Sequence, residues 1–124
     1  MLGCTCMYLC SDCWMFVDCL FTVPTFIVLP SNVTTLITST LQHMQCEADG
    51  YPIPTLTWQH RSMSSRSWQT VKRSSGRHHY ALAGRKLEFR KLIASDIGFY
   101  RCRADNALDI AFSEPAYLDL NGEA

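Results

Sequence analysis

The sequence lacks a long apolar run and any motif of catalysis. Asp18, Pro24 and Pro30 interrupt every stretch that could supply the about eighteen apolar residues of a membrane-spanning helix. We find no nucleophile elbow, paired-carboxylate motif, phosphate-binding loop or cluster of metal ligands. Helical periodicity and internal repeats are also absent. These absences give no support to a membrane helix, an enzyme, a cofactor or a metal site.

Cysteine is scarce outside the first residues. Five of the seven cysteines lie within residues 1–19, and only Cys46 and Cys102 follow. Residues 1–24 are apolar and do not alternate between apolar and polar side chains. They fit either a cleaved secretory signal peptide or sequence foreign to the domain, such as a translated upstream frame. Asp12 and Asp18 interrupt the apolar run, and no basic residue precedes it. Cys10-x-x-Cys13 has no second ligand pair, which disfavours zinc.

From Thr25 onward the sequence alternates in the manner of strands. Phe26 to Leu29, ended by Pro30, predicts an edge strand, which residues 33–38 continue. Further strands are expected at 41–48, around Leu56 and Trp58, around 68–72 and 78–82, at Leu87 and Phe89, through Cys102 to Ala107, and at 111–120. Residues 60–84 are polar, so their strands should be short. His78 and His79 are adjacent and would point to opposite faces of a strand, which favours a solvated pair in a loop over a shared metal.

Four features occur in an order and spacing that identify a family. They are Cys46, Trp58, and the Tyr100 and Cys102 of the run Asp96-Ile97-Gly98-Phe99-Tyr100-Arg101-Cys102, and the turn-rich Gly50-Tyr51-Pro52-Ile53-Pro54 lies between the first two. Over residues 25–120 the chain resembles an immunoglobulin domain of the intermediate (I-set) kind. The resemblance implies an all-β fold, a Greek-key sandwich of two antiparallel sheets. Residues 1–24 would then be a leader and residues 121–124 a tail, and the chain would be one domain of a longer protein.

The resemblance also assigns structural roles. Cys46 and Cys102 are expected to form the disulfide between the sheets, with Trp58 packed on it and Leu87 in the core. The ring of Tyr100 should point inward at a corner, with its hydroxyl bound to the backbone. Asp96 and Gly98 belong to that corner, and Arg77 is the expected partner of Asp96. Because such disulfides persist in secreted and cell-surface proteins, we expect an extracellular domain.

Charge is strongly separated along the chain. All eleven lysines and arginines lie between residues 61 and 103, where Glu88 and Asp96 are the only acids, so that segment has a net of nine positive charges although the whole chain is neutral. Such a segment attracts anionic partners. Heparan sulfate is the natural extracellular candidate, whereas nucleic acid is disfavoured by the expected disulfide. The candidate patch comprises Arg61, Arg66, Lys72, Arg73, Arg77, Arg85 and Lys86, provided that these side chains share one face.

The sequence therefore predicts a non-catalytic recognition module of an adhesion molecule, guidance receptor or receptor-kinase ectodomain. Its partners would be cell-surface or matrix proteins, homophilic or heterophilic, and any membrane attachment would come from the parent chain. Asn32-Val33-Thr34 is an acceptor for N-glycosylation in that setting. The alternative is an intracellular I-set spacer of a muscle filament protein, with reduced thiols. An antigen-receptor variable domain is set aside because residues 107–117 contain no Phe-Gly-x-Gly bulge.

Overall fold

The computed structural model describes residues 21–36 and 42–121, in which β-strands predominate. The strands are β1 (Thr22–Val28), β2 (Val33–Leu36), β3 (Gln42–Gln45), β4 (Glu47–Tyr51), β5 (Thr55–Arg61), β6 (Gln69–Thr70), β7 (His78–Ala81), β8 (Lys86–Phe89), β9 (Gly98–Asp105), β10 (Ile110–Phe112) and β11 (Ala116–Asn121). One 3-10 turn, Ala94–Asp96, precedes β9. The expectation of an all-β sandwich is confirmed.

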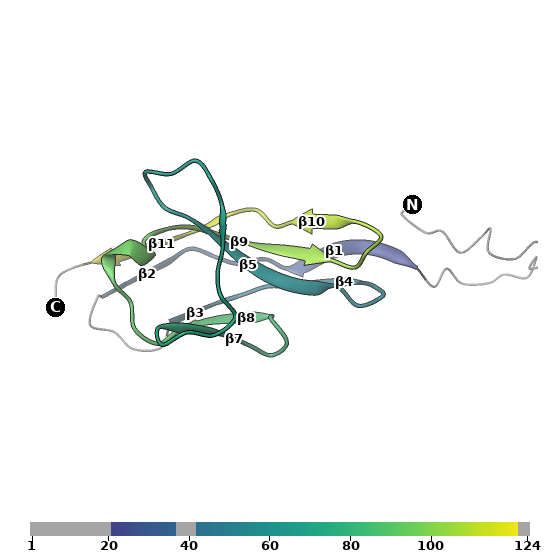
Figure 1. The fold of residues 1–124 in the computed structure, drawn as a ribbon, viewed down its shortest axis with the longest axis horizontal. Coiled ribbons are helices and arrows are strands. Elements are labelled where there is room, and N and C mark those ends of the chain that lie inside the picture. The colour runs from purple at the N-terminus through teal and green to yellow at the C-terminus, as the bar shows by residue number, and fades with distance from the viewer. Residues whose placement is uncertain (1–20, 37–41, 122–124) are drawn as a thin grey trace, which may run out of the picture.

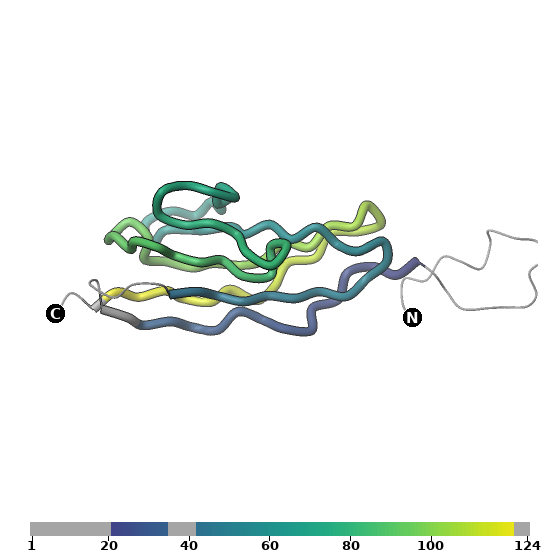
Figure 2. The backbone as a smooth tube through the Cα atoms, turned by 90° about the horizontal axis from the view of Figure 1, so that it is seen from below, coloured from purple at the N-terminus to yellow at the C-terminus, as the bar shows by residue number. Residues whose placement is uncertain are grey.

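The strands form two layers, which lie one above the other in Figure 1 and one behind the other in the view from below in Figure 2. In one layer β1 pairs with β4, and β3, β8 and β7 pair in that order. Only Cys46 separates β3 from β4, so these pairs continue one another. The other layer has the order β2-β11-β9-β5-β6, with β10 also paired to β9. The two ends of the described chain lie at opposite ends of the elongated molecule, as Figure 1 shows.

Alternation along β9 explains how the sequence builds the core. Its burial pattern alternates strictly, with Tyr100, Cys102 and Ala104 buried and the residues between them half-exposed. Trp58 and Leu56 face them from β5, and Leu87 and Met44 from the other layer. Each of these apolar side chains loses contact with water, which is the main force that holds the two layers together. Within residues 21–36 and 42–121, no helix is long and apolar enough to cross a membrane.

Four details differ from the sequence-based expectations, the first being that the strand expected at 111–120 is divided into β10 and β11. β1 begins at Thr22, inside the segment expected to be leader, and Asn106 Nδ2 donates a hydrogen bond to Thr22 O over 2.7 Å. β2 does not continue the edge of β1, because it pairs in parallel with β11 in the other layer. The strand expected at 41–48 is broken at Cys46, where its pairing changes from β8 to β1. Residues 1–20, 37–41 and 122–124 lie outside the described residues.

Candidate recognition surface

The centre of the sandwich is occupied by a disulfide and a tryptophan. Cys46 and Cys102 are bonded with a Cα–Cα distance of 6.5 Å, which confirms the predicted bridge. Trp58 is fully buried beside them in the same cluster, and its indole Nε1 donates to Gly84 O over 2.9 Å. Leu87 is also fully buried. These residues fix the relative position of the two layers and are not accessible to a ligand.

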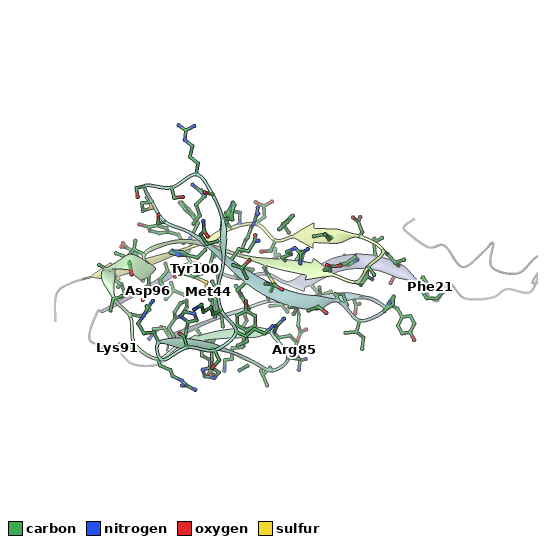
Figure 3. The ribbon with its side chains drawn as sticks, viewed as in Figure 1. Phe21, Met44, Arg85, Lys91, Asp96 and Tyr100 are labelled. Carbon is green, nitrogen blue, oxygen red and sulfur yellow. A yellow bond between two sulfur atoms is a disulfide. The ribbon has the colours of Figure 1, made fainter. Side chains whose placement is uncertain are left out.

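The corner before β9 is held by an ion pair and a tyrosine. Arg77 Nη1 donates to both carboxylate oxygens of Asp96, at 2.7 and 2.8 Å. Asp96 Oδ2 also accepts from Ile93 N, and Tyr100 Oη donates to Asp96 O over 2.7 Å. Burial raises the pKa of Tyr100, so its hydroxyl stays a donor. Asp96 and Tyr100 lie towards the end of the molecule opposite Phe21 (Figure 3).

Gly98 is required by the same corner. Its φ is +144°, a conformation that residues with a side chain rarely adopt. A Cβ at this position would lie 2.5 Å from Arg61 O, closer than such atoms approach. The glycine therefore lets β9 begin directly beside β5, where Arg61 pairs with Phe99. The corner is structural and offers no reactive group to a partner.

The two adjacent histidines are not a solvated loop pair, which corrects the sequence-based interpretation. Both lie in β7 and are half-buried. His79 Nε2 lies 3.0 Å from Glu88 Oε1 on the paired strand β8, whereas His78 contacts Ser75. Burial, and secondarily the charge of Arg77, lowers the pKa of His78. His78 and His60 line one cavity of about 500 Å³ at the corner. Among residues 21–36 and 42–121, no three potential metal ligands cluster.

The seven basic residues proposed as one patch do not share a face. Arg61 lies on β5 of the six-stranded layer, whereas Lys86 begins β8 of the opposite layer. Several of them are also neutralised by ion pairs. Arg77 binds Asp96, Lys86 Nζ lies 3.6 Å from Glu88, and Arg85 lies 3.6 Å from Glu47. Arg73 stacks on the Tyr80 ring at 4.8 Å. Arg66 and Lys72 are exposed. Charges that are close in sequence are separated here because their strands lie in different layers, and the position of a residue in the sequence does not reveal its layer.

A different group of side chains does gather, on the outer face of the six-stranded layer. The guanidinium carbon of Arg101 lies 4.3 Å from the centre of the Trp68 ring and 4.0 Å from that of Phe112. The guanidinium carbon of Arg61 lies 5.3 Å from the centre of the same tryptophan ring and 4.8 Å from that of Phe99. The Phe99 ring in turn packs 5.2 Å from Tyr117. We call this set the arginine–aromatic face: Arg61, Trp68, Phe99, Arg101, Phe112 and Tyr117.

Of the six residues of this face, the sequence had indicated only Arg61 as a candidate. Phe99, Arg101 and Arg103 alternate with the buried residues of β9, so their outward position could have been found from that period alone. Trp68 had no such signal, because it ends the polar loop that follows β5 (Figure 1). Its ring is held against the sheet by the two arginines. Burial, followed by the charge of Arg61, lowers the pKa of Arg101.

Asn32, the candidate for glycosylation, is exposed just before β2. Its Oδ1 accepts a hydrogen bond from Tyr117 N over 2.9 Å. The amide nitrogen, to which a glycan is attached, has no hydrogen bond within the described part of the chain. A glycan there would be anchored beside β11, next to the arginine–aromatic face.

Comparisons with known proteins place the chain among similar domains. The family model described as "Immunoglobulin domain" matches residues 24–106. Human "Cell adhesion molecule DSCAML1" is 30% identical over 102 residues, which are 77% of this chain and 5% of that protein. The structure titled "Tandem Ig repeats of Dlar" has a TM-score of 0.64 at 22% identity, covering 81% of this chain and 49% of the other. "Titin M4" has a TM-score of 0.67 at 18% identity, covering 82% and 99%. The chain thus spans about a twentieth of its first curated relatives.

Proposed function

The chain belongs to the immunoglobulin-domain family, and we propose that it is a non-catalytic, extracellular recognition module of a cell-adhesion or cell-surface receptor protein. The observation that best supports this proposal is the similarity to an adhesion molecule over 77% of the chain. The disulfide fits an oxidising compartment, where such bonds persist. Recognition would occur by protein–protein contact, because the described strands present sheet faces to solvent and bury the motif residues in the core.

Binding to live cells tests this proposal. The chain is fused to a dimerising tag, secreted from animal cells and applied to unpermeabilised cells of several types. We expect saturable binding that mild protease treatment of the target cells removes and heparan-sulfate-degrading enzymes spare. Absence of binding to every cell type, or binding that protease leaves intact, would contradict recognition by protein contact. Intact mass of the secreted product also reports leader removal, the disulfide and a glycan at Asn32.

Heparan sulfate binding is a second proposal. It is supported by the concentration of all eleven basic residues between positions 61 and 103, and by the exposure of Arg66 and Lys72. The cell experiment contains its test, since loss of binding after removal of heparan sulfate would favour the polysaccharide. The alternative of an intracellular filament spacer is supported by titin-like folds, a likeness of fold alone at 18% identity. Free thiols at Cys46 and Cys102 in native material would favour that alternative.

A further inference from the structure

Two arginines on the arginine–aromatic face have more guanidinium N–H donors than the hydrogen bonds they form within the described residues. Arg61 Nη1 donates to Ser65 O over 3.3 Å, and Arg101 Nε donates to the Gln59 side chain over 2.8 Å. A guanidinium has five N–H donors. Within the part of the chain that the structure describes, neither arginine forms an ion pair with a carboxylate, whereas neighbouring Arg103 contacts Asp105 at 3.3 Å. Arg61 and Arg101 therefore present positive charge that no carboxylate of the described residues neutralises.

The aromatic rings hold these charges in place. Each guanidinium lies over two rings, and both share the Trp68 ring. Stacking restricts a flexible side chain and leaves the N–H groups at the edge of the guanidinium directed away from the rings. A planar carboxylate can accept two such N–H groups at once. Because the arginines are held in position before binding, little side-chain entropy remains to be lost when a partner binds.

The surrounding surface fits a protein partner. Phe112 is 47% exposed, and nearby Ile110 is 43% exposed, so apolar area adjoins the two charges. Tryptophan, tyrosine, phenylalanine and arginine are enriched where proteins meet, and they provide most of the binding energy there. A sulfated polysaccharide would meet only these two cations on the face, because neighbouring Arg103 contacts Asp105. A second copy presenting the same face would place Arg61 and Arg101 against each other, which costs energy.

We propose that the arginine–aromatic face binds an acidic segment of a partner protein, whose carboxylates pair with Arg61 and Arg101 while its apolar side chains cover Trp68 and Phe112. Charge complementarity selects this occupant: the face offers unpaired guanidiniums, and the partner supplies the missing carboxylates. The inference deepens the proposed function and rests on it, since it names the surface and the chemistry of the protein contact. Asp119, two residues after Tyr117 on the same side of β11, is an acidic residue at the edge of this face.

The first test uses two capped peptides, one in which leucine alternates with glutamate and one in which it alternates with glutamine. Each is titrated into the isotopically labelled chain while NMR follows the side-chain N–H signals of Arg61, Arg101 and Trp68. We expect saturable shifts with the glutamate peptide only. The Arg61→Gln/Arg101→Gln variant should bind at least roughly tenfold more weakly, which is the effect of losing one charge-assisted contact. Arg90→Gln, which removes an exposed charge elsewhere, should leave the affinity unchanged.

Four results would overturn the proposal. They are no saturable shift with either peptide, equal shifts with both peptides, tighter binding of a heparin tetrasaccharide at the same signals, and shifts that depend on the concentration of the chain alone. The last two would assign the face to a polysaccharide or to a second copy. The cell-binding experiment separates this inference from the broader function. If the double variant folds and binds cells as well as the unmodified chain, protein recognition stands and this face is not its site.

Discussion

The basic side chains on the two outer faces of the sandwich have different contact partners. On the layer that contains β7 and β8, cations meet carboxylates: Lys86 contacts Glu88 at 3.6 Å, and Arg85 contacts Glu47 at 3.6 Å. On the layer that contains β5 and β9, Arg61 and Arg101 lie over aromatic rings instead. Figure 3 shows Arg85 on the first of these layers. A count of basic residues along the sequence therefore overstates the unpaired positive charge on the layer of β7 and β8 and understates that on the layer of β5 and β9.

This difference has a physical origin in the strands. The acids Glu47 and Glu88 lie beside the basic residues of the same layer, so attraction between neighbours neutralises them. β5 and the outward side of β9 from Phe99 to Arg103 contain no acid, and aromatic residues occupy the neighbouring positions. A ring attracts a cation but leaves its net charge in place. The arginine–aromatic face is thus available to an external anion, whereas Arg85 and Lys86 of the opposite layer are each paired with a carboxylate.

The largest expected effect comes from separating the two layers. Cys102→Ala breaks the bond from β9 to Cys46, and we expect it to lower the free energy of unfolding by about 2–5 kcal/mol, because the unfolded chain regains freedom. Chemical denaturation with the thiol of Cys46 blocked measures this loss. An unchanged denaturation midpoint would contradict this expectation and show that packing around Trp58 alone holds the layers together.

The next effect tests a cation that is paired and partly buried. Arg77→Met leaves the Asp96 carboxylate, whose side chain is only 8% exposed, without its ionic partner. We expect a loss of about 1–3 kcal/mol, because a buried charged group then lacks its strongest hydrogen bonds. Thermal and urea unfolding measure this loss, with Arg90→Met as the control for an exposed arginine. Equal stability of the two variants would mean that the corner is held by Tyr100 and the backbone alone.

A smaller effect concerns pH. Burial lowers the pKa of His60 and of His78 below 6.5, so the unfolded state takes up protons first as the pH falls. Stability is therefore full above about pH 6.5 and decreases below it, until the depressed pKa values of the folded state are passed. Unfolding measured between about pH 7.5 and 5.5 should show this decline. His60→Gln/His78→Gln should flatten the profile, and an equally steep decline in that variant would assign it to other groups.

Local patterns made the fold predictable. Cys46, Trp58 and Tyr100 each occupy a fixed place relative to a strand, and their combination specifies the sandwich without knowledge of any long-range contact. The change of pairing at Cys46 and the position of β2 beside β11 depend on which edges meet in space. Neither the residue types nor the alternation of a single strand contains that information.

The candidate surface was predictable only in part. Arg61 was selected for its charge, but its aromatic neighbours come from β9 and from the loop that ends at Trp68. Lys86 and Arg85 were selected by the same criterion, but Lys86 pairs with Glu88, two residues along the same strand, and Arg85 pairs with Glu47 of β4. A sequence gives the sign and number of charges. Partners from other segments, such as Glu47 for Arg85 and the Trp68 ring for Arg61, are defined only in the folded chain.

The smallest expected effect distinguishes the two faces directly. Double-mutant cycles measure the coupling between Arg101 and Trp68 and between Lys86 and Glu88, each by unfolding of the single and double variants. We expect about 0.5–1 kcal/mol for the Arg101–Trp68 pair and about 0.2–1 kcal/mol for the half-buried Lys86–Glu88 ion pair. At 1 M salt, where charges are screened beyond about 3 Å, the Lys86–Glu88 coupling across 3.6 Å should shrink. The Arg101–Trp68 coupling should persist, because the guanidinium lies on the ring with no water layer between them. If both couplings fell together, Arg101 would be held no more firmly than a surface lysine, and the arginine–aromatic face would lose the pre-positioned charge on which its recognition of an acidic segment depends.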